Sequence, residues 1–110
     1  MSSLTLRAEI TRAIQVATRT GQIAYGARRI SELALHGKAK LIILASNAPP
    51  ELRHDIEHYA KLSKIPVIVF EGTNIELGNV VGRPHSVTAL AIIDPGQSRI
   101  LDLVKQVSND

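Results

Sequence analysis

The sequence of 110 residues contains no cysteine and no tryptophan, and aromatic residues make up only 3% of it. Without cysteine, the protein has no disulfide, no thiolate zinc site, no iron–sulfur cluster and no cysteine nucleophile. The few aromatic rings predict an aliphatic core, and they argue against a flat aromatic platform that stacks several unpaired bases. Any stacking on bases by this protein therefore involves few side chains.

Long apolar runs are also absent. No uninterrupted apolar run is longer than that of residues 41–45, whereas a transmembrane helix needs roughly 20 such residues. Residues 1–10 lack the apolar segment of a secretory signal, and no linker, repeat or low-complexity tract divides the chain. We therefore expect a single cytoplasmic domain over residues 1–110 that has no membrane partner.

Positive charge is concentrated in the first third of the chain. Residues 1–40 contain seven basic and two acidic residues, a balance of +5, whereas residues 41–110 contain six basic and eight acidic residues, a balance of −2. Such an uneven distribution is typical of a protein with a polyanionic partner. Ordinary solvated helix surfaces account for the charge equally well.

Apolar periodicity and chain-breaking residues predict helices and strands in alternation. We expect helices at about 6–20, 27–36, 50–64, 74–81 and 100–110, and strands at 22–25, 41–45, 67–70 and 87–93. Thr73, with Glu76 three residues later, has the spacing of a capping box at the start of the fourth helix. Strands that alternate with helices form layered α/β folds. The sequence therefore predicts an α/β protein, a three-layer αβα sandwich with a central four-stranded sheet that is partly parallel.

Three segments, 26–29, 46–49 and 71–74, each follow a predicted strand and open a predicted helix. If those strands run in the same direction, the three segments lie together at one end of the sheet. Helix N-termini carry unpaired backbone N–H groups and a partial positive charge. This end of the sheet is therefore expected to attract phosphate or another oxyanion.

Basic and amide side chains occupy these segments. Arg28 and Arg29 follow Gly26 in a first helical turn, where the helix dipole favours acidic residues, so we interpret them as phosphate ligands rather than tolerated surface charges. Asn47 and Asn74 can hydrogen-bond a nucleic-acid group, although capping of the following helix explains each of them as well.

The segment 76–85 combines two glycines and several aliphatic residues with Arg83 before a proline. We expect it to form a packed surface loop with exposed aliphatic side chains. His85 at its end can stack on an unpaired base, although a single histidine before a strand is more often an ordinary surface residue.

Enzyme motifs are missing from the sequence. His54 and His58 have the spacing of a metal-binding pair, but no third ligand is placed by the sequence and the metalloprotease glutamate is absent. The dinucleotide fingerprint, the P-loop and the serine-nucleophile elbow are absent as well. We expect no catalytic residue, no metal and no cofactor.

A set of motifs in order along the chain resembles one known family. The motifs are Gly26-Ala27-Arg28-Arg29, Ala39–Ile43 with Asn47-Ala48-Pro49 after it, Tyr59–Ser63, Glu76-Leu77-Gly78 and Gly82-Arg83-Pro84-His85. They resemble the archaeal and eukaryotic e-type large-subunit ribosomal protein thirty, a family in the kink-turn RNA-binding superfamily. The resemblance implies an αβα sandwich that binds a sharply bent internal loop of ribosomal RNA and has no catalytic activity.

The same resemblance implies a set of RNA-binding residues. They are Gly26, Arg28, Arg29, Asn47, Arg53, Asn74, Leu77, Gly78, Val80, Val81, Arg83 and His85. Leu77, Val80 and Val81 are expected to lay apolar surface against an exposed base. This sequence departs from the family pattern at two places. Arg28-Arg29 stand where related proteins outside this branch carry Asn-Glu, and His85 stands where some members carry an aromatic ring.

The implied partner is the ribosomal RNA of the large subunit, with other ribosomal proteins as further candidates and a monomer as the free state. Two other functions remain open from the residues alone. One is a small enzyme or binder of a phosphorylated metabolite that uses the same end of the sheet. The other is a protein-interaction module whose loop 77–84 meets a protein partner.

Overall fold

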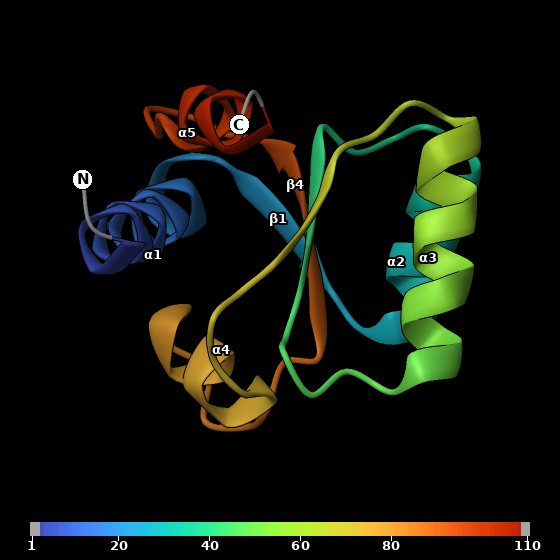
Figure 1. Ribbon diagram of the computed structural model, residues 1–110, viewed down its shortest axis with the longest axis horizontal. Coiled ribbons are helices and arrows are strands. Elements are labelled where there is room, and N and C mark those ends of the chain that lie inside the picture. The colour runs from blue at the N-terminus through green and yellow to red at the C-terminus, as the bar shows by residue number, and fades with distance from the viewer. Residues whose placement is uncertain (1–2, 109–110) are drawn as a thin grey trace.

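A four-stranded sheet lies between two layers of helices in the computed structural model, which describes residues 3–108 (Figure 1). The elements in chain order are α1 (Ser3–Thr20), β1 (Gln22–Tyr25), α2 (Ala27–Leu35), β2 (Leu41–Leu44), α3 (Pro50–Leu62), β3 (Val67–Val69), α4 (Asn74–Val80), β4 (Ala89–Asp94) and α5 (Ile100–Ser108). Helices α1, α4 and α5 cover one face of the sheet, and α2 and α3 cover the other. The α/β sandwich that the sequence predicts is confirmed.

The strand directions bring three connections together. The strand order is β1-β4-β2-β3, with β4 antiparallel to both β1 and β2, and with β3 parallel to β2. Strands β1, β2 and β3 therefore point the same way and finish at the same end of the sheet. The register confirms this, because Tyr25 pairs with Leu90 and Leu44 pairs with both Ala89 and Val69.

The last strand begins later than its sequence predicts. The expected strand starts at residue 87, whereas β4 starts at Ala89. The backbone N–H of Val87 donates to the carbonyl of Asn74 at 2.9 Å, which ties this segment to the start of α4 instead of to the sheet. The predicted last helix matches α5, and its final residues 109–110 lie outside the described part of the chain.

The core is aliphatic on both faces of the sheet. Leu41 and Ile43 of β2 pack against the α1, α4 and α5 side, and Ile42 and Leu44 pack against the α2 and α3 side. All four side chains are fully buried, and each burial stabilises the fold by about 1.5–3 kcal/mol. This double burial explains the continuous apolar run of β2. Phe70 is the one aromatic residue of the described chain in this core.

Candidate nucleic-acid interface

Four segments meet where β1, β2 and β3 finish. They comprise residues 25–29, 46–53, 72–76 and 82–88 and are called the asparagine rim. Hydrogen bonds join three of them, since Asn47 contacts Asn74 and the N–H of Val87 contacts the Asn74 carbonyl. Segment 25–29 is joined to segment 82–88 by the contact between Tyr25 and Arg83. The structure therefore brings together the segments that the sequence places after the first three strands.

Two of the three helix starts at the rim are open. Helix α2 begins after Gly26 and α3 begins after Pro49, and neither residue provides a side-chain cap. Gly26 adopts φ 97, a conformation that favours glycine, and a Cβ there would meet nothing within 4 Å. The backbone N–H groups of the first turn of α2 are thus free of side-chain caps and remain available to an anion. The start of α3 offers fewer, because Pro50 has no N–H and Glu51 places an acid in its first turn.

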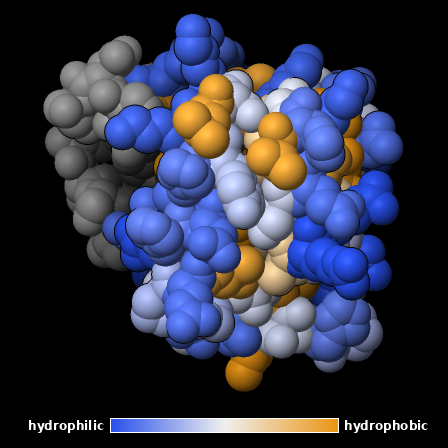
Figure 2. All heavy atoms as spheres, turned by 90° about the vertical axis from the view of Figure 1, so that its right-hand side faces the viewer, coloured by the Kyte–Doolittle hydropathy of each residue, from blue (hydrophilic) through white to orange (hydrophobic). Residues whose placement is uncertain are grey.

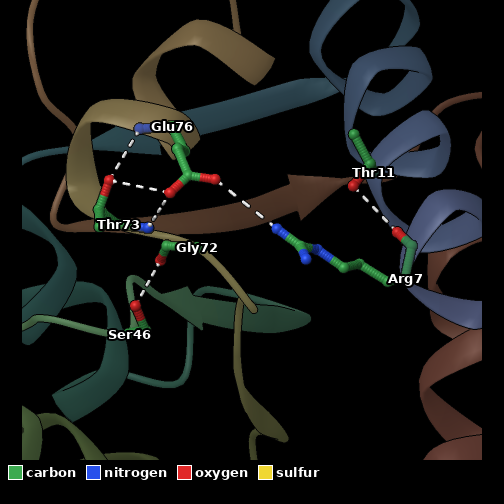
Figure 3. A network of polar contacts seen from close by, with 6 residues as sticks. All are labelled: Arg7, Thr11, Ser46, Gly72, Thr73 and Glu76. Atoms are coloured by element: carbon green, nitrogen blue, oxygen red, sulfur yellow. Dashed lines mark hydrogen bonds and ion pairs between the residues drawn. The ribbon is translucent and has the colours of Figure 1, made fainter. Parts of the chain in front are cut away.

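The start of α4 is closed, which corrects the expectation that all three helix starts offer unpaired N–H groups. Thr73 and Glu76 form the capping box predicted by their spacing, in which the Glu76 N–H donates to Thr73 Oγ1 at 3.3 Å. The Glu76 carboxylate also forms an ion pair with Arg7 of α1 at 3.6 Å (Figure 3). The Thr73–Glu76 box therefore closes the start of α4 and anchors it to α1.

Asn47 and Asn74 form a reciprocal side-chain pair. The backbone N–H of Asn74 donates to Asn47 Oδ1 at 2.9 Å, and Asn47 Nδ2 donates to Asn74 Oδ1 at 3.0 Å. Asn47 thus caps α4, not the α3 helix that follows it in sequence. One N–H of Asn47 and both of Asn74 have no acceptor among the side chains of residues 7–105 or the described backbone. The pair presents amide donors to a ligand.

The connection that carries Asn47 is held in place by Ser46. The Ser46 hydroxyl donates to the carbonyl of Gly72 at 2.8 Å (Figure 3). The Ser46 backbone N–H donates to the same carbonyl at 2.9 Å. Gly72 itself cannot carry a side chain, because a Cβ there would lie 2.6 Å from the ring of Phe70. The two asparagines therefore project from connections that are bonded to each other, which fixes their donors in space.

The arginines of the rim are exposed and differ in their partners. The Arg28 side chain is 96% exposed, and its Nε lies 3.9 Å from Glu32, so this ion pair contributes little. Arg29 is exposed and has no ion pair with the described residues. Arg53 Nε lies 2.6 Å from Glu57 Oε1, so this arginine already has an ion-pair partner. Arg28 and Arg29 are consequently the cations of α2 that are free for a phosphate.

Arg83 reaches the rim from the loop between α4 and β4. Its guanidinium carbon lies 4.1 Å from the centroid of the Tyr25 ring, a cation–π contact. Its backbone N–H donates to the carbonyl of Gly78 at 2.9 Å. Tyr25 is a rim residue that the sequence did not single out, because its partner lies far away along the chain. The contact holds the 82–88 segment beside the start of α2.

The backbone of His85 lies directly against Gly78 of α4. A Cβ on Gly78 would lie 2.3 Å from the carbonyl oxygen of His85, so only glycine lets the loop rest on α4. The His85 side chain is exposed, with Nδ1 3.2 Å from the carbonyl of Ser86. The ring is thus placed at the surface of the rim.

The aliphatic residues of α4 require a correction. Leu77 and Val81 are 0% and 7% exposed and belong to the core, so the expectation that they lie exposed is wrong. Gly78 is also buried, and Val80 is partly buried against the same core. The seven-residue helix α4 uses its apolar stripe to attach to the sheet. Its exposed aliphatic residue is Ile75, at 65%, which the sequence did not single out.

A hollow of about 440 Å³ lies between three of the four rim segments, 25–29, 46–53 and 82–88. Its lining residues are Tyr25, Gly26, Ala27, Pro49, Leu52, His85, Ser86, Val87 and Thr88. Most of these side chains are apolar and none is an acid, a lysine or an arginine. The hollow therefore suits a flat apolar group. The cations and the amide donors of the rim lie outside its lining.

The described residues form neither a metal-binding cluster nor a membrane-spanning helix. No group of three His, Asp or Glu side chains within residues 3–108 is placed to bind a metal, so the pair His54 and His58 gains no third ligand. In the same part of the chain, no helix combines the length and the apolar character of a membrane span. The rim is thus the site that the sequence and the structure share.

Comparison with known proteins gives consistent matches over most of the chain. Residues 8–102 match the family described as ribosomal protein L7Ae/L30e/S12e/Gadd45. A protein named large ribosomal subunit protein eL30 from Methanothermobacter thermautotrophicus is 51% identical over 96 residues, covering 87% of this chain and 98% of the relative. Its namesake from Pyrobaculum neutrophilum is 50% identical over 99 residues, covering 90% and 98%. These relatives are named as ribosomal proteins, not as enzymes.

A solved structure shares the fold. It is described as a protein with unknown function from Bacillus halodurans, and it superposes with a TM-score of 0.65 at 25% sequence identity. The similarity covers 93% of this chain and 95% of the other. The same arrangement of helices and strands therefore occurs in a distant protein.

Proposed function

Because the chain belongs to the ribosomal protein L7Ae/L30e/S12e/Gadd45 family, we propose that it is a structural protein of the large ribosomal subunit whose asparagine rim binds a kinked internal loop of ribosomal RNA. The protein then serves translation as part of the cytoplasmic ribosome. Its partner is ribosomal RNA, and the chemistry at the rim is recognition without catalysis.

The observation that carries this proposal is the combination of features on one rim. An apolar hollow, a pair of asparagines with free N–H donors and two exposed arginines lie around the open starts of α2 and α3. A bent internal loop of RNA offers the matching set, since it displays unstacked bases and places phosphates close together. A continuous duplex offers the phosphates but keeps its bases stacked.

Arg28 and Arg29 are assigned to phosphates. Both stand in the first turn of α2, which has no acidic residue, and the helix dipole there disfavours positive charge. In the free protein the repulsion between these arginines and the positive end of the α2 dipole costs stability. A bound phosphate is attracted by both the arginines and the helix N-terminus, so it compensates for this repulsion. Phosphate contacts of this kind supply affinity and salt dependence and carry no sequence information.

Asn47 and Asn74 are assigned to a displaced base or a sugar. Their mutual hydrogen bonds use both side-chain oxygens, so the pair offers donors. Donors of fixed position distinguish an unpaired base edge from a paired one, because the edge of a paired base is already occupied. The pair therefore contributes the preference for a kinked RNA over a continuous duplex.

The hollow and the loop beside it are assigned to the unstacked base. Tyr25 and Leu52 provide apolar lining, and His85 stands at the border with an exposed ring that can stack on a base. Leu77 and Val81 support the binding from the core by holding α4, and Gly78 lets the loop approach. Their part in recognition is therefore indirect.

Titration of RNA tests this function directly. A kinked internal-loop RNA and a continuous duplex of the same length are each titrated with the protein at several salt concentrations. We expect the kinked RNA to bind more tightly at every salt concentration, and equal affinity for the two RNAs would contradict the proposal. Sedimentation of the tagged protein with large ribosomal subunits, followed by crosslink mapping, identifies the RNA element. Release by ribonuclease is expected, because the proposed anchor is RNA.

A further inference from the structure

The end of the sheet opposite the rim carries a second basic surface. It consists of residues 35–40, between α2 and β2, and residues 61–66, between α3 and β3, and is called the lysine end. Its basic residues are Lys38, Lys40, Lys61 and Lys64, all of them exposed, and neither segment contains an acidic residue. None of these lysines forms an ion pair with the described residues.

Direct contacts join the two segments of the lysine end. The Ser63 hydroxyl donates to the carbonyl of Leu35 at 3.3 Å. A Cβ built on Gly37 would lie 3.7 Å from the Cβ of Ser63. Ile42 pairs with Val67 in the parallel register of β2 and β3, so the residues that enter these strands also lie side by side. The lysines therefore belong to one surface.

Lys64 occupies a backbone conformation that suits glycine better. It has φ 60, and it is the one residue other than glycine with positive φ in the described chain. Gly37, which follows α2 in the corresponding place, has φ 66. A side chain in this conformation costs free energy, and the attraction of an exposed lysine to the helix dipole is weaker than that cost. Lys64 therefore stands where the backbone conformation alone favours glycine.

The lysine end is separated from the rim by the length of α3. Figure 1 shows α3 running from one end of the sheet to the other, and the molecule measures 32 × 32 × 26 Å. Figure 2 shows that the surface over α2 and α3 is largely hydrophilic, with hydrophobic side chains scattered from one end of it to the other. An RNA bound at the rim therefore leaves the lysine end free.

We propose that the lysine end binds the phosphate backbone of a second RNA segment, so that the protein links two segments of RNA from opposite ends of its sheet. Lysine ammonium groups act as point charges toward phosphate and do not read bases. Four exposed lysines in two segments that contain no acid are the complement of an RNA backbone. This inference extends the proposed function and relies on the rim to hold the first RNA.

A two-step capture experiment separates the two sites. Labelled kinked RNA is first saturated with protein, and a second label on a continuous duplex then reports capture at increasing salt. We expect the wild-type complex to capture the duplex at low salt and to release it as salt rises. Failure of the first step would contradict the proposed rim function. A normal first step without any duplex capture would overturn the lysine-end proposal.

Charge variants test which residues are responsible. Substitution of both Lys38→Gln and Lys64→Gln is expected to lower the slope of log affinity for the captured duplex against log salt by about two. The affinity for the kinked RNA should stay within about twofold of the wild-type value, because both residues lie away from the rim. An unchanged slope would overturn the assignment.

Lys64→Gly provides a variant that cannot fail merely by unfolding. Relief of the left-handed conformation is expected to raise the melting temperature by about 4–8 °C, while the slope for the captured duplex falls by about one. Lys64→Arg should keep the slope. Capture by Lys64→Gly with the wild-type slope would show that the charge is not used and would contradict the proposal.

Leu62→Ser is the matched control for a protein partner. Leu62 is 68% exposed beside the lysines, and Leu35 is 51% exposed. RNA phosphates gain nothing from either leucine, so this variant is expected to capture the duplex like the wild type. A loss as large as that of the lysine variants would indicate an apolar docking surface for a protein and would overturn the RNA assignment.

Discussion

The two ends of the sheet use different basic residues. The rim segments 25–29, 46–53, 72–76 and 82–88 contain arginines and no lysine, whereas the lysine end contains lysines and no arginine. A guanidinium is planar, stacks on rings and donates in fixed directions, as Arg83 does over Tyr25. An ammonium group on a flexible chain offers charge alone. The rim is therefore suited to recognising a shape, and the lysine end to holding a polyanion of any sequence.

The glycines at the two ends of the sheet are required for different reasons. Gly78 is required because another segment of backbone, at His85, lies directly against it. Gly37 at the lysine end has ordinary space around its Cβ position and is required only by its φ of 66. The rim is thus a surface built by close approach of separate segments, which ties its geometry to the fold.

The largest effect is expected from Gly78→Ala. The new Cβ would meet the His85 carbonyl at 2.3 Å, and the resulting shift of backbone should lower the free energy of unfolding by about 2–3 kcal/mol. The loop would then move away from the hollow, so the affinity for kinked RNA should fall by about tenfold or more. Urea unfolding and RNA titration measure the two quantities.

The matched control at the other end is Gly37→Ala. Its Cβ would lie 3.7 Å from Ser63, so about 1 kcal/mol of conformational strain is expected, with unchanged affinity for kinked RNA. Equal effects of the two alanines on kinked-RNA binding would remove the distinction between the ends.

Substitutions of Asn47 are expected to rank next. Asn47→Asp keeps an oxygen for the Asn74 N–H, but it removes both amide N–H groups of Asn47, including the one that donates to Asn74 Oδ1, and it adds negative charge. Because the bond to the Asn74 N–H remains, the fold should lose no more than about 1.5 kcal/mol of stability, while the affinity for kinked RNA falls by about tenfold or more. Asn47→Ala additionally loses the cap of α4, which costs about 1 kcal/mol. Thermal unfolding and titration separate these contributions.

If Asn47 only caps α4, Asn47→Asp should bind kinked RNA like the wild type. That outcome would leave the rim with positive charge alone and would make it equivalent to the lysine end. A fall of the same size for the kinked and the duplex RNA would have the same meaning.

Arg28→Ala is expected to have a smaller effect. The slope of log affinity against log salt should fall by about one for kinked RNA. Stability should change by less than about 0.5 kcal/mol, because the variant removes an unfavourable charge from the first turn of α2 together with a weak ion pair. An unchanged slope would exclude a phosphate contact at this residue. Lys38→Gln is the control, and its slope for kinked RNA should match the wild type.

Tyr25→Leu is expected to give the smallest effect. It removes the ring beneath Arg83 and should lower stability by about 0.5–1 kcal/mol, with a loss of affinity for kinked RNA of up to about fivefold. Tyr25→Phe retains the ring and should behave like the wild type. A loss of equal size in Tyr25→Phe would assign the effect to the hydroxyl instead of the cation–π contact.

The sequence predicts the frame of the site well. The apolar run of β2 and the alternation of helices with strands lead to a sandwich in which three strand ends meet, and the register of β1, β2 and β3 confirms this. The Thr73 and Glu76 spacing likewise predicts a cap that forms. These features are local, because each depends on residues within one or two helical turns.

The residues that the sequence misjudged depend on distant partners. Asn47 looks like a cap for α3, whereas its partner Asn74 lies 27 residues away. Leu77 and Val81 look like exposed loop residues because their burial depends on how α4 docks against the sheet. Tyr25 becomes a rim residue through Arg83 and through the hollow that it lines together with residues distant in the sequence. Contacts between separate connections follow from the strand order, which no local pattern reveals.

Mapping of backbone amide shifts in isotope-labelled protein tests the central difference between the two ends most directly. On addition of an equimolar kinked RNA, we expect the large shift changes at residues 25–29, 46–53, 72–76 and 82–88. Residues 35–40 and 61–66 should remain near their free positions until a second RNA is supplied. Large changes at residues 35–40 and 61–66, with little change along the asparagine rim, would contradict the assignment of RNA recognition to that rim.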